Sequence, residues 1–140
     1  MTLIGARSLR SAFAATVVVW FAASLVGCAS ARPLTPVEVS DVKSVAGTWR
    51  GIVYRSSFEP EKVEVTIRED GSYDLVSRHP NGTSRGKGKM VTTSDGRLII
   101  QGEKGRGVAT LLSNGGDRVM SIQATLSDNS VLTADLYPHR

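Results

Sequence analysis

Turn-forming residues divide the chain at short intervals from Ala46 onward. Asn-Gly and Asp-Gly pairs between apolar runs are typical of β-hairpins, and the pair at residues 81–82 predicts a type I′ turn. The turn signals are Asp70-Gly71, Asn81-Gly82, Asp95-Gly96, Gly115-Gly116 and Ser127-Asp128-Asn129. Eight β-rich runs lie around them, near residues 47–56, 61–69, 72–79, 84–93, 97–103, 107–113, 118–126 and 130–137. Connections this short leave no room for crossover helices, which predicts antiparallel pairing in chain order.

Apolar and polar side chains alternate along several of these runs. Val63, Val65 and Ile67 alternate with polar neighbours, and the same period of two recurs in residues 120–126 and 132–136. Such alternation gives a sheet one apolar face and one wet face. Eight sequential strands would expose two sheet edges, and closing the sheet removes both. The sequence therefore predicts an all-β domain over residues 45–140, built as an eight-stranded antiparallel up-and-down meander barrel.

The predicted interior contains few large side chains. A barrel of about eight strands is wide enough either to be filled by its side chains or to hold one small ligand. The aromatic residues after position 28 are Trp49, Tyr54, Phe58, Tyr73 and Tyr137. So little aromatic area predicts an interior filled by aliphatic side chains rather than a roomy pocket. Gly86 and Gly88 are expected to face inward, where they would leave space for a bulky neighbour such as Trp49 or for a ligand.

The first 27 residues have the layout of an export signal. Arg7 and Arg10 form a basic start, and residues 12–26 form an apolar run. A membrane-spanning helix usually needs about 20 apolar residues, more than this run supplies. We therefore expect a secretory signal peptide over residues 1–27 rather than a transmembrane anchor.

Leu25-Val26-Gly27-Cys28 follows the apolar run and contains the only cysteine of the chain. The stretch resembles the lipobox of bacterial lipoproteins. That resemblance implies that Cys28 is lipidated, becomes the new N-terminus and holds the protein to a membrane through its acyl chains. Ala29 and Ser30 stand where inner-membrane lipoproteins carry an aspartate, which implies the outer membrane. The alternative is an ordinary signal cleaved near Ala29 or Ala31, with Cys28 discarded.

Residues 28–44 are expected to form a tether that ends in a short helix. Small residues and proline at its start suit a spacer between a bilayer and a domain. Thr35-Pro36-Val37-Glu38 has the spacing of a capping box with proline at the first helical position. This pattern predicts a short helix near residues 36–44.

Gly47-Thr48-Trp49 opens the first β-rich run. This G-x-W pattern, placed after a short helix and before an eight-run meander, resembles the start of lipocalin-like (calycin) barrels. The resemblance covers roughly residues 36–137 by pattern and implies that Trp49 closes one end of the barrel interior. In lipocalins a late arginine stacks on that tryptophan. Arg118 lies one strand early for this role and Arg140 is terminal, so the sequence predicts no such pair.

Basic and acidic residues are segregated along the chain. Residues 78–106 carry seven basic and two acidic residues, whereas residues 38–77 carry five and eight. Arg85, Lys87 and Lys89 alternate with small residues and should point outward from one strand; we call these three the basic comb. The comb either discourages edge pairing of a solvated strand or binds an anionic lipid, a glycan or an envelope protein. Because no aromatic residue interleaves with it, a nucleic-acid partner is not expected.

Signals for catalysis and metal binding are weak. Gly82-Thr83-Ser84-Arg85-Gly86 matches G-x-S-x-G, but a nucleophile elbow needs a strand, a turn and a helix, and here the pattern lies in a hairpin. His79, expected in a turn before Pro80, and His139 are the only histidines, so no zinc or copper site is expected. We predict no catalytic residue, no metal and no cofactor.

Two functions of different classes agree with these features. The first is a non-enzymatic, lipid-anchored envelope lipoprotein, facing the periplasm, whose barrel binds a macromolecular partner. The partner would be a protease or another hydrolase if the chain acts as small lipocalin-like inhibitors do, and the expected signature is a solid interior. The alternative is a lipocalin-like carrier of a small apolar or amphipathic ligand, which a cavity above a few hundred cubic ångströms would favour. An enzyme is the third choice.

Overall fold

Eight antiparallel strands follow one another along the chain, as the turn spacing predicts. The computed structural model describes residues 32–140, so the predicted export signal and Cys28 lie outside the described residues. Within this range no helix has the length and apolarity needed to cross a membrane. The eight strands are β2 (Gly47–Arg55), β3 (Glu61–Ile67), β4 (Ser72–His79), β5 (Gly82–Thr92), β6 (Leu98–Gly102), β7 (Gly105–Ser113), β8 (Arg118–Leu126) and β9 (Val131–Pro138).

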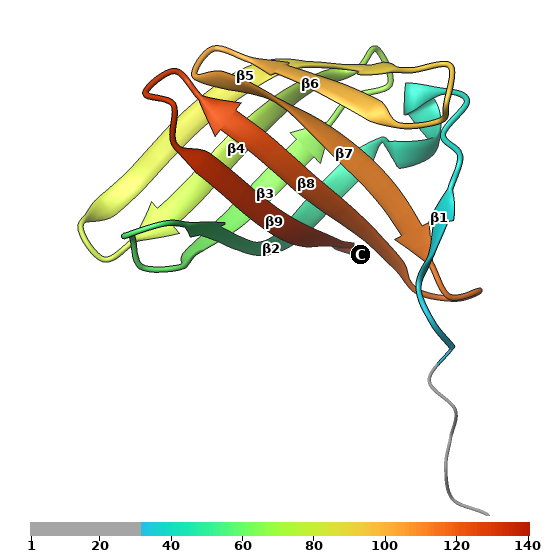
Figure 1. Ribbon diagram of the computed structural model, residues 1–140, viewed down its shortest axis with the longest axis horizontal. Helices are drawn as coiled ribbons and strands as arrows, with labels where there is room; N and C mark the ends of the chain where they lie inside the picture. Colours follow the sequence, from blue (N-terminus) through green and yellow to red (C-terminus); the bar gives the residue numbers. More distant parts are fainter. Residues whose placement is uncertain (1–31) are drawn as a thin grey trace, which may run out of the picture. The chain divides into compact units, whose positions relative to one another are not determined.

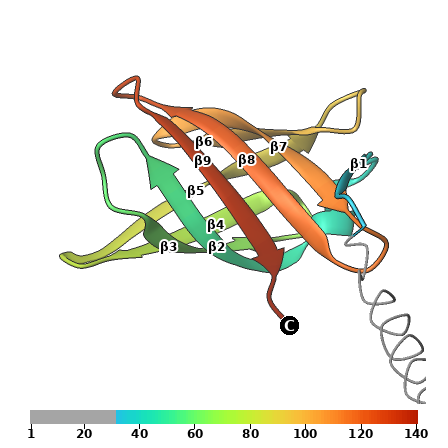
Figure 2. The same ribbon diagram turned by 60° about the horizontal axis from the view of Figure 1, so that its bottom comes forward.

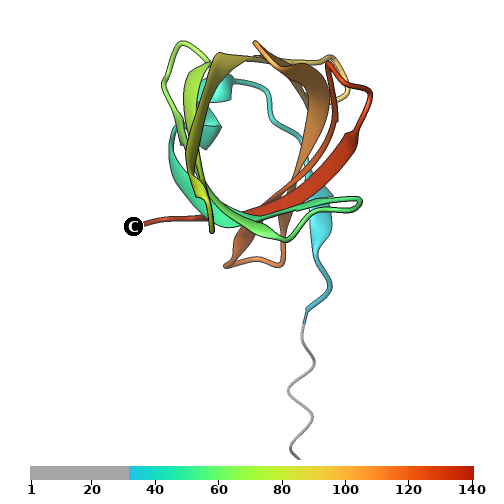
Figure 3. The same cartoon turned by 90° about the vertical axis from the view of Figure 1, so that its left-hand side faces the viewer.

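Pairing of the first and last of these strands closes the sheet. Each strand pairs with its chain neighbour, and β2 pairs with β9 in a register that runs from Trp49↔Pro138 to Arg55↔Leu132. Gly51 lies in this seam, where an added Cβ would come within 2.0 Å of the carbonyl oxygen of Asp135. The view along the barrel shows the resulting ring of strands (Figure 3). The predicted up-and-down barrel of eight strands is confirmed.

The segment before the barrel differs from the prediction. Thr35–Val37 forms a short strand, β1, rather than the first turn of a helix. β1 pairs with β7 from Thr35↔Ser113 to Val37↔Leu111. β6 pairs with β7 only as far as Ala109, so the last residues of β7 have an open edge, which β1 covers. This long-range pairing, and not the local capping box, decides the conformation of residues 35–37.

A single turn of 3₁₀ helix, η2, connects β1 to the barrel. It spans Val42–Val45, and the Asp41 side chain caps it by accepting a hydrogen bond from the Lys43 backbone N–H at 3.0 Å. The predicted helix near residues 36–44 is therefore wrong in its start and its type. The capping acceptor is Asp41 and not Thr35, whose hydroxyl donates to the Ser113 carbonyl instead.

The hairpin between β4 and β5 also differs from the prediction. His79 pairs with Gly82, so Pro80 and Asn81 occupy the two central turn positions. A type I′ turn needs positive φ at both central residues, which the proline ring forbids. Gly82 takes the positive φ, 140°, directly after the turn. The predicted type I′ turn at Asn81-Gly82 is therefore wrong by one position and in type.

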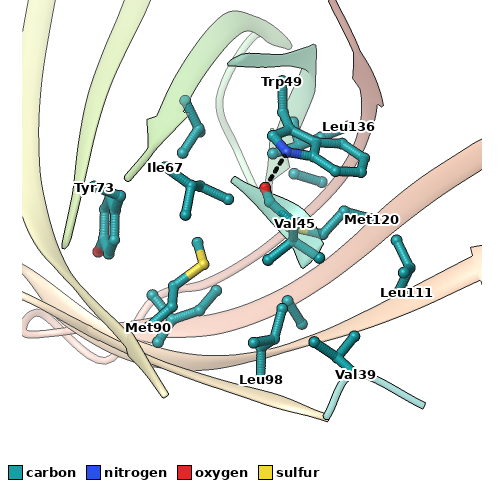
Figure 4. Packing of buried hydrophobic residues seen from close by; sticks show 14 of the residues in the cluster. Val39, Val45, Trp49, Ile67, Tyr73, Met90, Leu98, Leu111, Met120 and Leu136 are labelled. Carbon is teal, nitrogen blue, oxygen red and sulfur yellow. Dashed lines mark hydrogen bonds between the residues drawn. The ribbon is translucent and has the colours of Figure 1, made fainter. Parts of the chain in front are cut away.

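One end of the barrel is densely packed. η2 and β1 lie at this end, which we call the packed end (Figures 1 and 2). Trp49 is 2% exposed, and its indole N–H donates to the Val45 carbonyl at 2.8 Å, so the tryptophan joins η2 to the wall of the barrel. The side chains packed around this pair come from most of the strands and from the segment before them (Figure 4): Val39, Ile67, Met90, Leu98, Leu111, Met120 and Leu136.

Candidate functional site

The other end of the barrel is hollow. A cavity of about 650 Å³ opens between the β2–β3, β4–β5 and β6–β7 connections, and we call this opening the mouth. Apolar side chains from opposite sides of the barrel form its wall: Val53, Val63, Val65, Leu75, Ile100, Ile122 and Leu132. The predicted filled interior is therefore wrong for this half. A volume of this size lies within the range of about 300–1,000 Å³ that is usual for small-molecule sites.

Small inward-facing residues explain why this half is hollow. β5 carries Ser84, Gly86 and Gly88 on its inner face, and β8 and β9, across the barrel, contribute Ala124 and Ala134. A Cβ placed on Gly86 would have no atom within 4 Å. The space that sequence analysis assigned to inward glycines is therefore open at Gly86.

The second inward glycine of β5 serves a different purpose. A Cβ on Gly88 would lie 2.7 Å from the Tyr73 hydroxyl, and one on Gly102 of the next strand would lie 2.6 Å from it. Tyr73, on β4 opposite Gly88, thus lies across two adjacent strands that have no side chains to obstruct it. The bulky neighbour of Gly88 is Tyr73, and not Trp49 as the sequence analysis considered.

A charged cluster lies just inside the mouth, on inward-facing positions of three strands. The Glu61 carboxylate accepts hydrogen bonds from Arg55 Nη2 and from Ser77 Oγ, each at 2.6 Å. The Ser77 hydrogen bond, followed by the hydrogen bond and charge of Arg55, lowers the pKa of Glu61 against the opposing effect of burial. These residues were not predicted from the sequence. The alternation along each strand could have identified them. Glu61 lies two positions before the inward-facing Val63, and Arg55 lies two positions after the inward-facing Val53, so each shares the inner face of its strand.

The β2–β3 connection places an exposed aromatic ring at the mouth. Phe58 is 57% exposed, and the Arg55 guanidinium carbon lies 4.4 Å from its ring centroid. The preceding residue, Ser57, has a φ of 67°, which turns the chain over the rim. Arg55 therefore contacts both the internal Glu61 and the external Phe58, and it fixes the edge of the opening.

Trp49 lies at the packed end, where the lipocalin resemblance places it. Arg118 is its cationic partner: the guanidinium carbon lies 5.7 Å from the tryptophan ring centroid, and Nη2 donates to the Ser44 carbonyl at 2.9 Å. The expectation that no arginine stacks on Trp49 is therefore wrong. β8 begins at Arg118 at the packed end, next to the β2–β9 seam, so an arginine one strand early still reaches the ring.

The basic comb lies on the outside of the barrel. Arg85, Lys87 and Lys89 are exposed, whereas the residues between them face inward. Lys87 lies 3.6 Å from the Glu103 carboxylate, and the side chains of this pair are 70% and 56% exposed. The comb side chains therefore point away from the interior, although Arg85 and Lys87 also border the cavity at the mouth.

Ser84 and His79 face the mouth but do not form a catalytic arrangement with Glu61. Both oxygens of Glu61 are bound by Arg55 and Ser77, and among residues 32–140 no hydrogen bond joins His79 to Ser84 or to Glu61. A nucleophile and its base need to lie about 2.6–3.2 Å apart. In the same part of the chain, no group of three or more His, Asp and Glu side chains is arranged to hold a metal ion.

Comparison with known proteins supports the fold alone. No protein family and no curated protein matches this sequence. Among solved structures, the chain is similar to a redesigned β-barrel, with a TM-score of 0.53 and 15% sequence identity over 74% of this chain and 100% of the other. The likeness agrees with a small antiparallel β-barrel.

Proposed function

We propose that this protein is a lipid-anchored envelope protein whose barrel binds a small amphipathic ligand through the mouth. The observation that carries the proposal is the open cavity of about 650 Å³ in one half of an otherwise packed barrel. Protein interiors are normally close-packed, so an apolar space of this size has a stability cost that a bound ligand would offset. Of the two functions considered from sequence, the carrier is the one that a hollow barrel supports.

The lining of the cavity supports an amphipathic rather than a purely apolar ligand. The walls are aliphatic, whereas Arg55, Glu61 and Ser77 form a polar cluster at the rim. Ligand sites usually combine a largely apolar wall with a few positioned polar groups. An apolar tail would bury against Val63, Val65 and Ile122, and a polar part would lie near the mouth.

Filling the cavity tests this proposal directly. The described residues form a compact unit with its own core and closed sheet, so we expect residues 32–140 to fold alone, and circular dichroism checks this first. The apolar fluorophore N-phenyl-1-naphthylamine should bind the unmodified domain, and Gly86→Leu should reduce its affinity at least about ten-fold, because the new side chain enters the open space.

Gly116→Leu is the matched control for that experiment. Gly116 also has no atom within 4 Å of an added Cβ, but it lies in the exposed β7–β8 connection at the packed end. This variant should bind the fluorophore as the unmodified domain does. If the fluorophore does not bind, or binds equally to both leucine variants, the proposal is wrong.

The basic comb supports a second proposed function, binding of an anionic envelope partner. Arg85, Lys87 and Lys89 are exposed in a row, and basic groups near an anionic surface contribute about 1 kcal/mol each before screening by salt. Exchanging all three for glutamine should abolish capture of an envelope protein, glycan or anionic vesicle that the unmodified domain retains. Equal capture by the unmodified domain and the glutamine variant would show that the comb is a solvated surface and not a binding site.

The membrane anchor rests on the lipobox resemblance at Cys28. Cys28→Ser should move the full-length protein from the outer-membrane fraction to the periplasmic soluble fraction or leave it unprocessed, and it should abolish incorporation of labelled palmitate. Unchanged fractionation and labelling would refute the anchor.

A further inference from the structure

The hydroxyl of Tyr73 is a polar group inside the cavity without a protein partner. Tyr73 is 7% exposed and lines the cavity, and its hydroxyl lies against Gly88 and Gly102. Among residues 32–140 no hydrogen bond to this hydroxyl is formed. In the same range every fully enclosed side-chain oxygen or nitrogen has a hydrogen-bond partner. The hydroxyl is therefore not fully enclosed, and because Tyr73 lines the cavity, water or a ligand in the cavity can reach it.

Such a hydroxyl is unusual for a buried tyrosine. Tyrosine O–H groups usually find a hydrogen-bond partner when they are buried, because leaving one unpaired costs free energy. A phenylalanine would fill the same place over Gly88 and Gly102 without that cost. The ring explains the two glycines, whereas the hydroxyl is explained by no contact within the described residues.

The surroundings of the hydroxyl favour a neutral partner. Burial, together with the negative charge of Glu103, raises the pKa of Tyr73, so the phenol keeps its proton and acts as a donor. Lys87 is paired with Glu103, so burial and not charge decides the partner: a carboxylate next to the hydroxyl would lose its hydration, which costs more free energy than burying a neutral group. A carbonyl or hydroxyl oxygen accepts the hydrogen bond without adding charge.

We propose that Tyr73 is the internal hydrogen-bond donor of the cavity, and that the ligand is an amphiphile with a neutral acceptor such as an ester, ketone, amide or alcohol. The assignment rests on the proposed function, because it needs a ligand in the cavity. The geometric basis is a buried hydroxyl that lines the hollow half, is reachable from it and has no protein partner.

Three probes of equal chain length separate the alternatives: methyl decanoate, decanoate and decane, each measured by displacement of N-phenyl-1-naphthylamine at neutral pH. The unmodified domain should bind the ester more tightly than the carboxylate. Tyr73→Phe should weaken binding of the ester about three- to ten-fold, the effect of one hydrogen bond, and change binding of decane less than about two-fold.

A measurement on the unmodified domain covers the case in which Tyr73→Phe does not fold. The Tyr73 Cζ resonance, observed with ¹³C-labelled tyrosine, should shift on addition of the ester beyond its shift with decane. Tighter binding of the carboxylate, equal losses for ester and decane, or equal shifts would overturn the assignment of Tyr73 while leaving a binding cavity in place. Failure of the fluorophore to bind at all would instead reject the proposed function.

Discussion

The packed end and the mouth are built from the same strands but differ in how their inward positions are occupied. At the packed end these positions carry Trp49, Leu98 and Leu111, whereas at the mouth they carry Gly86, Ala124 and a charged pair. The packed end thus supplies most of the buried apolar contact, and the mouth supplies the open volume. Stability and a candidate binding site are therefore located in different halves of one barrel.

Because of this division, we expect substitutions in one half to alter stability and substitutions in the other half to alter ligand binding. Removing a large side chain at the packed end creates a void among close-packed neighbours, which do not collapse fully into it. Adding a side chain at the mouth fills space that already exists. The two halves should therefore respond to substitution in opposite ways.

The largest effect is expected for Trp49→Ala. The change removes a 2% exposed indole and its hydrogen bond to the Val45 carbonyl. We expect the free energy of unfolding to fall by about 3–5 kcal/mol, as for other buried aromatic side chains. Urea denaturation followed by circular dichroism measures the loss. A loss below about 1 kcal/mol would show that the packed end does not dominate stability.

The second largest effect is a difference in stability between substitutions at two inward-facing glycines of β5. A Cβ at Gly88 would lie 2.2 Å from the Gln101 carbonyl oxygen, whereas one at Gly86 would meet nothing within 4 Å. Gly88→Ala should therefore lower the free energy of unfolding by about 1–3 kcal/mol, and Gly86→Ala should change it by less than about 0.5 kcal/mol. Both are measured by the same denaturation experiment. Equal losses would contradict the difference in space at the two positions.

The smallest effect concerns the charged cluster at the mouth. The pKa of Glu61 is lowered in the folded protein, chiefly by Ser77 and then by Arg55, with a small contribution from the charge of His79. Its stabilising contribution is therefore present above the ordinary glutamate pKa of about 4.3 and is lost as the pH falls through the lowered folded value. Glu61→Gln should cost about 1 kcal/mol at neutral pH and have less effect in acid.

Denaturation curves of both proteins between neutral and acidic pH check this prediction. The difference in unfolding free energy between the unmodified domain and Glu61→Gln should shrink as the pH falls. Exposed turn aspartates, whose pKa values are also lowered, act equally in both proteins and cancel in this difference. A difference that stays constant with pH would show that the ion pair does not contribute through the charge of Glu61.

Local pattern was enough to predict the barrel. Alternation of Val63, Val65 and Ile67 with polar neighbours decides which side of β3 faces inward, and short turns decide the strand order. β1 was not predictable in this way. It is three residues long, and it forms because β7 continues past the end of β6.

The shape of the interior was not predictable because it depends on pairs of residues far apart in the chain. Gly86 and Gly88 are equivalent in sequence pattern, but only Gly88 is covered by Tyr73. The same limit explains why Arg118 was not matched with Trp49, since strand closure and tilt decide which late arginine reaches the ring. Alternation along the strand did predict that the basic comb points outward, because that prediction depends on the residues of β5 alone.

The position of β1 bears on the proposed attachment of the protein through its N-terminal segment. Thr35 pairs with Ser113 and Arg32 lies close to Gly115, so the chain joins the barrel at the end opposite the mouth. The proposed anchor upstream of Arg32 would thus attach at the packed end and not at the mouth. Exchange of the proposed ligand through the opposite face would then require neither release of the proposed anchor nor rearrangement of the β1–β7 junction.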